Sequence, residues 1–453
     1  MHNNDRANFG SRLGIILATA GSAVGLGNVW RFPYMAGHDG GAAFILLYLA
    51  CVLFLGIPGM ISEFIVGRNS ATNAARAYIK LSHSRPWGLI GYMGVFTGMI
   101  ILGFYAVVAG WCLQYFFASI LEHLQGDKDY IMNYFATFSS SPFKPAAWAV
   151  AFLFITHYIA SHGIRDGIER ASKVMMPTLF VLLIIIVVAS CTLPGAAEGV
   201  EFLFKPDFTK ITPNVFLDAL GQAFFSLSLG SACLCTYASY FNRQTNLGKS
   251  AVQVALIDTM IAVLAGLMIF PAAFSVGVSP DSGPSLIFIT LPNVFQQAFS
   301  GMPTLGYVIS VMFYALMALA ALTSTISMHE IATAFFHEEL NLSRRGGSLI
   351  VTAICCVIAV LCSLSVGAVS GLSFFGKSLM DSLDFITAQI FLPLGSFLTC
   401  LFVGWHIPKR ITVYEFTNHG TLKGTFFKVY LFAVRYVCPA AIAAIFLHQF
   451  GIL

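Results

Sequence analysis

The sequence predicts an all-α polytopic membrane protein, and two observations carry this prediction. Of the 453 residues, 57% are hydrophobic and only 10% are charged, whereas about 25% of the residues of a soluble domain are charged. The mean hydropathy is +0.81, and apolar runs close to the roughly 20 residues that cross a bilayer recur along the chain. We therefore expect one transmembrane domain over residues 1–453, built from spanning helices.

Eleven apolar runs have the length and composition of spanning helices. Several exceed about 25 residues, which indicates tilt or extension beyond the bilayer rather than additional crossings. In chain order, the expected spans are about 13–36, 42–66, 88–121, 146–161, 174–193, 213–238, 250–277, 304–336, 348–367, 379–404 and 428–450.

The distribution of positive charge predicts the orientation. If the N-terminus is cytoplasmic, 18 of the 24 Lys and Arg residues fall in cytoplasmic segments. This asymmetry favours a cytoplasmic N-terminus, and eleven spans then place Leu453 outside. The remaining six, on the outer side, are Arg31, Lys128, Lys144, Lys205, Lys210 and Lys377.

The first span contains a break in the sequence GSAVGLGNVWRFPY, residues 21–34. Gly21, Gly25 and Gly27 each weaken a helix by roughly 1 kcal/mol relative to Ala. Unpaired backbone groups are tolerated at membrane depth only where they are buried in protein or line a cavity. Asn28 and Arg31 follow, and polar residues at this depth indicate a functional site. The break therefore predicts a binding site for a small polar molecule.

The sixth span repeats this feature, because Ser226, Ser228, Gly230 and Ser231 interrupt it. Ordinary packing of small residues would explain this interruption alone. Spans one and six are five apart, however, and an odd period inverts the second half in the membrane. Paired interruptions in equivalent helices indicate a transporter site, and inverted repeats supply alternating access. The expected units are a first repeat over about 13–193, a second over about 213–404 and an eleventh helix over about 428–450.

Other function classes find little support in the sequence. The ten cysteines show no metal or redox spacing, and there is no basic stripe for nucleic acid. An ion channel should show a repeated filter or a carboxylate ring, and an enzyme a nucleophile–base set or metal cluster; neither is apparent. We expect no catalytic residue, no organic cofactor and no nucleic-acid partner. A receptor that binds the same substrate without transport stays open, as does the oligomeric state.

Several motifs carry a family resemblance over most of the chain. The chain resembles the neurotransmitter:sodium symporter family, and most closely its bacterial, eleven-span amino-acid transporters of the leucine-transporter fold. The resemblance implies a sodium-coupled amino-acid symporter in a bacterial inner membrane, with the substrate and the lipid bilayer as its partners. Besides GSAVGLGNVWRFPY, the motifs are GGAAF at 40–44, GIPGMISEF at 56–64, GIERASKVMMP at 167–177, FFSLSLG at 224–230 and ALTSTIS at 321–327.

The resemblance implies two sodium sites made of oxygen donors, which suit a hard cation. The first would use the Ala23 carbonyl, Asn28, Ser226 and Asp258, together with the substrate carboxylate. The second would use the carbonyls of Gly21, Val24 and Ala320 with the hydroxyls of Thr323 and Ser324. Taken alone, a Thr-Ser pair in a helix more often bonds back to the preceding turn.

The resemblance also implies the substrate residues. The carboxylate would meet the N–H groups of Leu26 and Gly27, where a helix dipole favours an anion, and the Tyr105 hydroxyl. The ammonium would meet carbonyls of Ala23, Phe225 and Ser228. The side chain would be enclosed by Ile101, Tyr105, Phe225, Ser228, Ser231, Ser324 and Met328.

Three positions bear on specificity. Gly25 replaces an acidic residue of monoamine-transporting relatives, which favours an amino acid over a monoamine. Ser231 occupies an often bulky position, which favours large hydrophobic or aromatic substrates. Asp258 stands at a position where an Asn is common in the family, while Ala262 stands where some relatives carry a carboxylate. A fixed charge at Asp258 could do the work of chloride, so we expect chloride-independent transport.

Two ion pairs resemble the gates of the family. Arg31 and Asp384 resemble the extracellular pair. Arg6 and Glu338 resemble the cytoplasmic latch, although Glu replaces the more familiar Asp and Phe9 replaces a Trp. Each pair alone would equally be a surface salt bridge worth about 0–1 kcal/mol.

Overall fold

The computed structural model describes residues 8–277, 286–369, 371–374 and 376–449, and these residues are mostly helical. The expected all-α class holds apart from one short antiparallel pair, in which β1 (Ser373–Phe374) lies beside β2 (Lys377–Ser378). Ser373 is opposite Ser378, and Phe374 is opposite Lys377. This pair lies in the loop before the tenth expected span.

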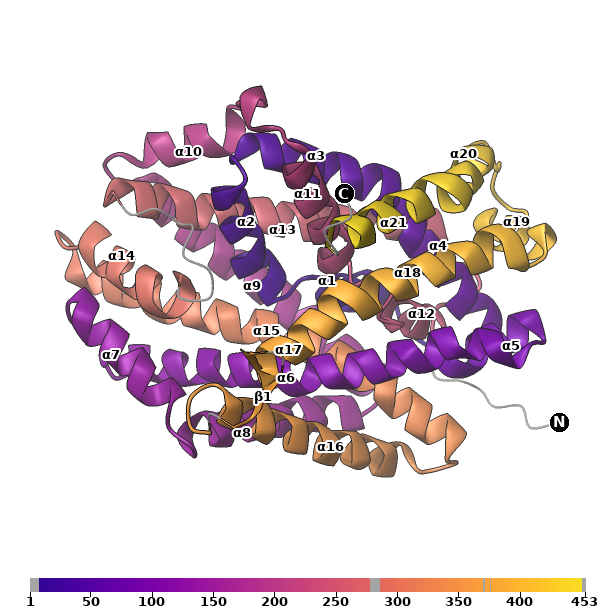
Figure 1. The fold of residues 1–453 in the computed structure, drawn as a ribbon, viewed down its shortest axis with the longest axis horizontal. Coiled ribbons are helices and arrows are strands. Elements are labelled where there is room, and N and C mark those ends of the chain that lie inside the picture. The colour runs from indigo at the N-terminus through magenta and orange to yellow at the C-terminus, as the bar shows by residue number, and fades with distance from the viewer. Residues whose placement is uncertain (1–7, 278–285, 370, 375, 450–453) are drawn as a thin grey trace.

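The helices follow the apolar runs of the sequence (Figure 1). The α-helices are α1 (Arg12–Ala23), α2 (Phe32–His38), α3 (Ala42–Cys51), α4 (Ile57–Ser70), α5 (Ala74–Ser82), α6 (Gly88–Ile120), α7 (Lys128–Ser139), α8 (Lys144–Ser161), α9 (Arg170–Cys191), α10 (Ala196–Phe204), α11 (Pro213–Ser226), α12 (Cys233–Ala238), α13 (Leu247–Ser275), α14 (Leu291–Ala298), α15 (Pro303–Glu339), α16 (Arg344–Ser365), α17 (Leu379–Asp384), α18 (Leu392–Leu401), α19 (Lys409–Phe416), α20 (Phe427–Phe432) and α21 (Cys438–Gln449).

Short helical turns of other types join or extend these helices. The π-helical turns are η1 (Gly27–Arg31), η2 (Val52–Gly56), η4 (Ile164–Glu169), η6 (Leu286–Thr290), η7 (Phe385–Phe391), η8 (Phe402–His406) and η9 (Ala433–Val437), and the 3₁₀ turns are η3 (Arg85–Trp87) and η5 (Phe208–Lys210).

Among the described residues, eight continuous helices are long and apolar enough to cross a membrane, and two bent helix pairs raise this number to ten. The bent pairs correspond to the first and fourth expected spans. The remaining expected span, 213–238, consists of α11 and α12, which residues 227–232 separate. Each piece alone is too short to cross, so the count of eleven stays a prediction.

The break in the first span lies slightly later than the glycines indicate. Helix α1 continues through Gly21 to Ala23, Val24 has extended backbone, and the two halves are bent by 55°. Gly21 lies inside α1, and a Cβ there would make ordinary van der Waals contacts, 3.4 Å from Met176 Sδ and 3.5 Å from Thr323 Cβ. Neither the backbone nor the packing therefore requires glycine at this position.

The break in the sixth span occurs where the sequence predicts it. Ser228, Gly230 and Ala232 have φ values of +54°, +79° and +62°, which a helix cannot continue through. The Gly230 N–H donates to Glu63 Oε1 at 2.6 Å. A carboxylate of the second span thus satisfies part of the backbone that the break releases.

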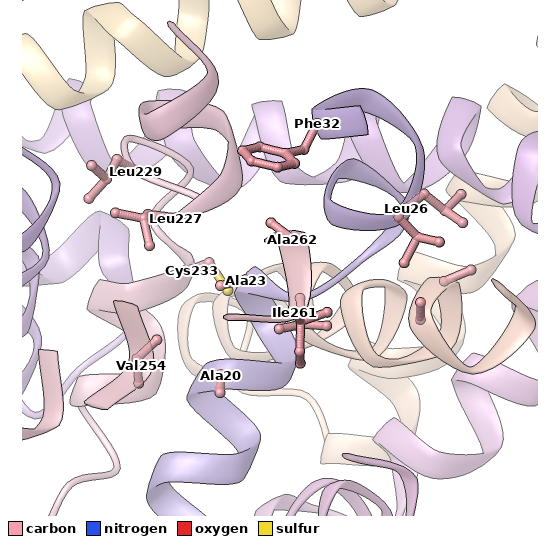
Figure 2. Close-up of a cluster of buried hydrophobic side chains, with 14 of the residues drawn as sticks. Ala20, Ala23, Leu26, Phe32, Leu227, Leu229, Cys233, Val254, Ile261 and Ala262 are labelled. Carbon is pink, nitrogen blue, oxygen red and sulfur yellow. The ribbon is translucent and has the colours of Figure 1, made fainter. Parts of the chain in front are cut away.

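The two breaks lie within the helix bundle. Helix α1 packs against α9, α13 and α15, and the long α6 packs against α8, α15 and α16. Figure 2 shows buried apolar side chains around the breaks, including Ala23, Leu227 and Ile261. This packing surrounds the irregular backbone with protein, as the membrane interior requires.

Candidate functional site

A cavity of about 460 Å³ lies where the two breaks meet. Its walls come from the end of α1, residues 25–27, α6, the 226–231 segment and α15, and it extends to α17 and η7. All of the substrate residues expected from the resemblance line it, namely Ala23, Gly25, Leu26, Gly27, Ile101, Tyr105, Phe225, Ser226, Ser228, Ser231, Ser324 and Met328.

Further lining residues were not expected from the sequence. On α6, Gly98, Phe104 and Val108 lie at helical spacing from Ile101 and Tyr105, so they share one face of the helix. That spacing was the signal available in the sequence. Trp111 on the same helix, Ser22 on α1 and Ser327 on α15 also line the cavity, and Cys233 and Phe288 come from α12 and η6, which only the fold brings close.

The backbone at the first break is held by local hydrogen bonds. The Gly25 N–H donates to Asn28 Oδ1 at 3.0 Å, and the Leu26 N–H donates to the Tyr105 hydroxyl at 2.9 Å. Tyr105 therefore lies beside the N–H groups that begin the outer half of the span. An anion there would meet both the N–H groups and the positive end of the helix dipole.

Gly25 keeps space open inside the cavity. A Cβ at this position would overlap Ser324 Oγ and lie 2.9 Å from the Tyr105 hydroxyl oxygen. Any larger side chain would therefore occupy the space in front of Tyr105. Gly27 has a similar role on the other side, because its Cβ would lie 2.9 Å from Phe225 Cε1.

The first oxygen cluster consists of Asn28, Ser226 and Asp258, with Ala23 nearby on the cavity wall. Asp258 is fully buried on α13. Its Oδ1 accepts from Asn28 Nδ2 at 2.7 Å, and its Oδ2 accepts from Ser226 Oγ at 2.7 Å. The structure thus brings together three side chains that are far apart in sequence.

Tyr48 belongs to this cluster and was missed in the sequence. Its hydroxyl donates to Asp258 Oδ2 at 3.2 Å, and its ring is fully buried. A tyrosine in an apolar run carries no sequence signal that separates this role from packing. With Tyr48 included, neutral donors surround the Asp258 carboxylate.

The second oxygen cluster consists of Gly21, Val24, Ala320, Thr323 and Ser324. The Thr323 hydroxyl donates to the Val24 carbonyl at 3.1 Å and to the Ala320 carbonyl at 2.9 Å. The Ser324 hydroxyl donates to the same Val24 carbonyl at 3.2 Å. These groups therefore lie together where the end of α1 meets α15, and none of them carries a formal charge.

The first expected gate consists of Arg31 and Asp384. Arg31 and Asp384 both line the outer part of the cavity. Within the described residues they form no ion pair within 4.0 Å, and the Arg31 guanidinium lies 4.2 Å from the centre of the Phe225 ring. A cation over an aromatic face is itself a favourable contact. The expected Arg31–Asp384 pair is therefore not formed in this structure.

The other expected gate lies partly outside the described residues, because Arg6 is not among them. Glu338 Oε2 accepts from the backbone N–H of Asn73 at 2.7 Å. Phe9 is buried and lies 6.0 Å from the Tyr237 ring in an edge-to-face arrangement. Phe9, expected in the place of a Trp, is thus held by aromatic packing against Tyr237.

The comparisons with known proteins agree with the resemblance. A model of the Sodium:neurotransmitter symporter family matches residues 6–131 and 140–452. YhdH, an uncharacterized sodium-dependent transporter of Bacillus subtilis, is 38% identical over 447 residues that cover 98% of each chain. An uncharacterized sodium-dependent transporter of Haemophilus influenzae is 35% identical over 465 residues, covering 99% of each.

A solved structure is similar over the whole fold. The crystal structure of MhsT in complex with L-phenylalanine has a TM-score of 0.89 and 40% sequence identity. The match covers 98% of this chain and 99% of MhsT. The chain therefore belongs to the sodium:neurotransmitter symporter family, whose members are membrane transporters and not enzymes.

Proposed function

We propose that this protein is a sodium-coupled symporter that imports a hydrophobic L-amino acid by alternating access. Large or aromatic amino acids are its preferred substrates, two sodium ions accompany each substrate, and chloride is not required. The sodium dependence of its relatives supports the ion. The L-phenylalanine complex of MhsT supports the substrate class.

The single observation that carries this proposal is the environment of Asp258. Within the described residues this buried carboxylate contacts neutral donors, the side chains of Asn28, Ser226 and Tyr48. A charge buried in the interior of a membrane protein is costly unless an opposite charge compensates it. A sodium ion is the compensating charge that fits the oxygen atoms of the first oxygen cluster.

Both oxygen clusters are proposed as sodium sites. The first would use Ala23, Asn28, Ser226 and Asp258, and the second would use the five residues of the second oxygen cluster. Because the first ion would also bind the substrate carboxylate, each would increase the affinity of the other, and linkage makes this effect reciprocal.

The substrate is proposed to lie between the clusters. Its carboxylate would be bound by the N–H groups of Leu26 and Gly27 and by the Tyr105 hydroxyl. Its ammonium would be bound by carbonyls of Ala23, Phe225 and Ser228. The cavity of about 460 Å³ is large enough to support an aromatic side chain.

The proposed architecture has eleven spans in an inner membrane, with the N-terminus cytoplasmic and the C-terminus outside. Residues of about 13–193 and 213–404 form two inverted repeats of five helices, and the last helix lies outside the repeats. Arg31 with Asp384 would close the outer end of the cavity, and Arg6 with Glu338 the cytoplasmic end. The two interrupted spans in equivalent positions of the two halves support this arrangement.

The function can be tested with purified protein in proteoliposomes. An inward sodium gradient should drive uptake of labelled amino acids, with phenylalanine, tyrosine, tryptophan and leucine competing better than glycine or alanine. Replacement of chloride by gluconate should leave uptake unchanged. Uptake that is indifferent to sodium would contradict the proposal, and binding without uptake would favour a receptor.

The number of sodium ions has a measurable consequence. Each ion that crosses with a zwitterion contributes about 2.3 kcal/mol per 100 mV. At 100 mV, two ions contribute about 4.6 kcal/mol, which is enough for a substrate concentration roughly a thousandfold higher inside than outside. An accumulation ratio that responds to voltage with half this slope would indicate a single ion.

A further inference from the structure

Besides Ser226 of the first oxygen cluster, five serines line the cavity, and we call them the serine wall: Ser22, Ser228, Ser231, Ser324 and Ser327. They come from the end of α1, the break between α11 and α12, and α15. Four of the five are at most 7% exposed, and Ser228 is half-buried. These hydroxyls are therefore removed from bulk water, and their hydrogen bonds must come from protein or from a bound molecule.

Each of these hydroxyls donates its hydrogen to a main-chain carbonyl. The shortest bonds run from Ser22 to Thr19 and from Ser231 to Ser228, both at 2.7 Å. The others run from Ser327 to Thr323 at 3.0 Å, from Ser228 to Ser22 at 3.1 Å and from Ser324 to Val24 at 3.2 Å.

A hydroxyl has one hydrogen to donate but two lone pairs that accept. Ser327 Oγ already accepts from the Tyr237 hydroxyl at 2.7 Å and Ser231 Oγ from the Cys233 N–H at 3.3 Å, which leaves one lone pair on each, and Ser324 belongs to the second oxygen cluster. Since the five hydrogens are already used, the remaining lone pairs make the serine wall mainly an acceptor. The cavity lining also includes apolar groups, among them Gly98, Ile101 and Met328. A ligand side chain in this part of the cavity would therefore contact apolar groups and the hydrogen-bond acceptors of the serine wall.

We propose that the serine wall selects hydrophobic amino acids whose ring carries an N–H or O–H donor, such as tryptophan and tyrosine, over ring analogues without a donor. This inference rests on the proposed function and refines its substrate class. A side chain that ends in a carbonyl or carboxylate is rejected, because its lone pairs would face those of the serines.

The same acceptors would also suit the ammonium group of the substrate. The test must therefore change the ring and leave the α-ammonium and α-carboxylate groups unchanged. Replacing the indole N–H of tryptophan by sulfur gives 3-(3-benzothienyl)alanine, which keeps the shape and is more apolar. Apolar transfer alone would favour the sulfur analogue. A preference for tryptophan therefore reports the hydrogen bond.

The experiment measures how strongly each analogue inhibits sodium-dependent uptake of labelled phenylalanine by the full-length protein in proteoliposomes. We expect tryptophan to inhibit about fivefold more strongly than its sulfur analogue, and tyrosine about fivefold more strongly than 4-methylphenylalanine, as one neutral hydrogen bond provides. Equal inhibition within each pair overturns the serine-wall proposal alone. Absence of sodium-dependent uptake of any amino acid overturns the proposed function instead.

Three variants locate the effect: Ser22→Ala, Ser231→Ala and Ser327→Ala. At least one should bring the ratio of inhibition by tryptophan to inhibition by its sulfur analogue close to unity. Inhibition by unlabelled phenylalanine, which has no ring donor, reports any general loss of substrate binding in the same variant. The matched control is Ser275→Ala, since Ser275 also donates to a carbonyl of its own helix, Ala272, at 2.7 Å but does not line the cavity. A tryptophan preference that persists in all three variants overturns the proposal.

Discussion

The two oxygen clusters both lie at the first break but differ in charge. The first oxygen cluster contains a carboxylate, Asp258, held by Asn28, Ser226 and Tyr48. The second consists of hydroxyls and carbonyls, with Thr323 and Ser324 donating to the Val24 carbonyl. The same kind of ion would thus meet a formal charge at one site and only dipoles at the other.

This difference indicates separate roles for the two clusters. A carboxylate attracts a cation strongly at close range, and it also supplies the negative charge that chloride could otherwise bring. Neutral oxygens bind a cation through ion–dipole attraction, and each ligand contributes only a part of it. Substitutions should therefore have one large effect in the first cluster and smaller ones in the second.

The largest effect is expected for Asp258→Asn. At about 4 Å and an effective dielectric constant near 20, a charge pair contributes about 4 kcal/mol. Loss of this attraction should raise the sodium concentration for half-maximal uptake by about two to three orders of magnitude. Uptake by the variant should also become sensitive to chloride, whereas uptake by the unchanged protein should not.

The matched control for this variant is Asp218→Asn, a partly buried carboxylate on α11 that does not line the cavity. It should leave sodium activation unchanged. If uptake by the unchanged protein is abolished when gluconate replaces chloride, the role assigned to the Asp258 charge is wrong.

A somewhat smaller effect is expected for Gly25→Ala, which tests the coupling between sodium binding and substrate binding. The added Cβ would overlap Ser324 Oγ and crowd the Tyr105 hydroxyl, and overpacking of this kind costs about 1–3 kcal/mol. Substrate affinity should therefore fall by about fivefold to a hundredfold. Binding of labelled sodium should rise less with substrate than in the unchanged protein, and displacement of the Ser324 hydroxyl should also weaken binding at the second oxygen cluster. Sodium binding that rises with substrate as it does in the unchanged protein would contradict this coupling.

Thr323→Val should have a moderate effect, because it removes one neutral oxygen without changing charge or size. One such ligand corresponds to about 1–1.5 kcal/mol, so half-maximal sodium should rise about fivefold to tenfold, with chloride independence retained. Thr325→Val is the control two residues along α15, since Thr325 is equally buried and bonds to Thr156 Oγ1 at 3.0 Å. Equal effects of the two variants would remove Thr323 from the proposed site.

The sequence predicts the helical architecture well because apolar runs and helix breaks are local features. The interruption at 226–231 matches the break that the structure shows at 227–232. Gly21 was misread as part of the first break, because a glycine inside a continuous helix and one that ends a helix look alike in sequence. The β1–β2 pair was not predicted, since two-residue strands leave no periodic pattern.

The site is harder to predict from local patterns, because its parts come from distant segments. Helical spacing could have added Gly98 and Val108 to Ile101 and Tyr105. No pattern connects Tyr48 with Asp258, which are 210 residues apart. The family resemblance supplied the remaining candidates, and the fold shows which of them meet.

The smallest expected effects distinguish two hydroxyls that donate to the same atom. Ser226 and Tyr48 both donate to Asp258 Oδ2, at 2.7 Å and 3.2 Å. Ser226 is a proposed sodium ligand, so Ser226→Ala should weaken sodium activation about threefold to fivefold. Tyr48 donates a hydrogen bond to the Asp258 carboxylate and is not a proposed sodium ligand. A sodium ion bound to the carboxylate would weaken the Tyr48 hydrogen bond by drawing on the same lone pairs. Tyr48→Phe should therefore leave sodium activation unchanged or strengthen it about twofold, measured in the same uptake assay. Opposite signs for the two variants would show that the ion binds between Ser226 and Asp258, whereas equal losses would make Tyr48 a ligand as well.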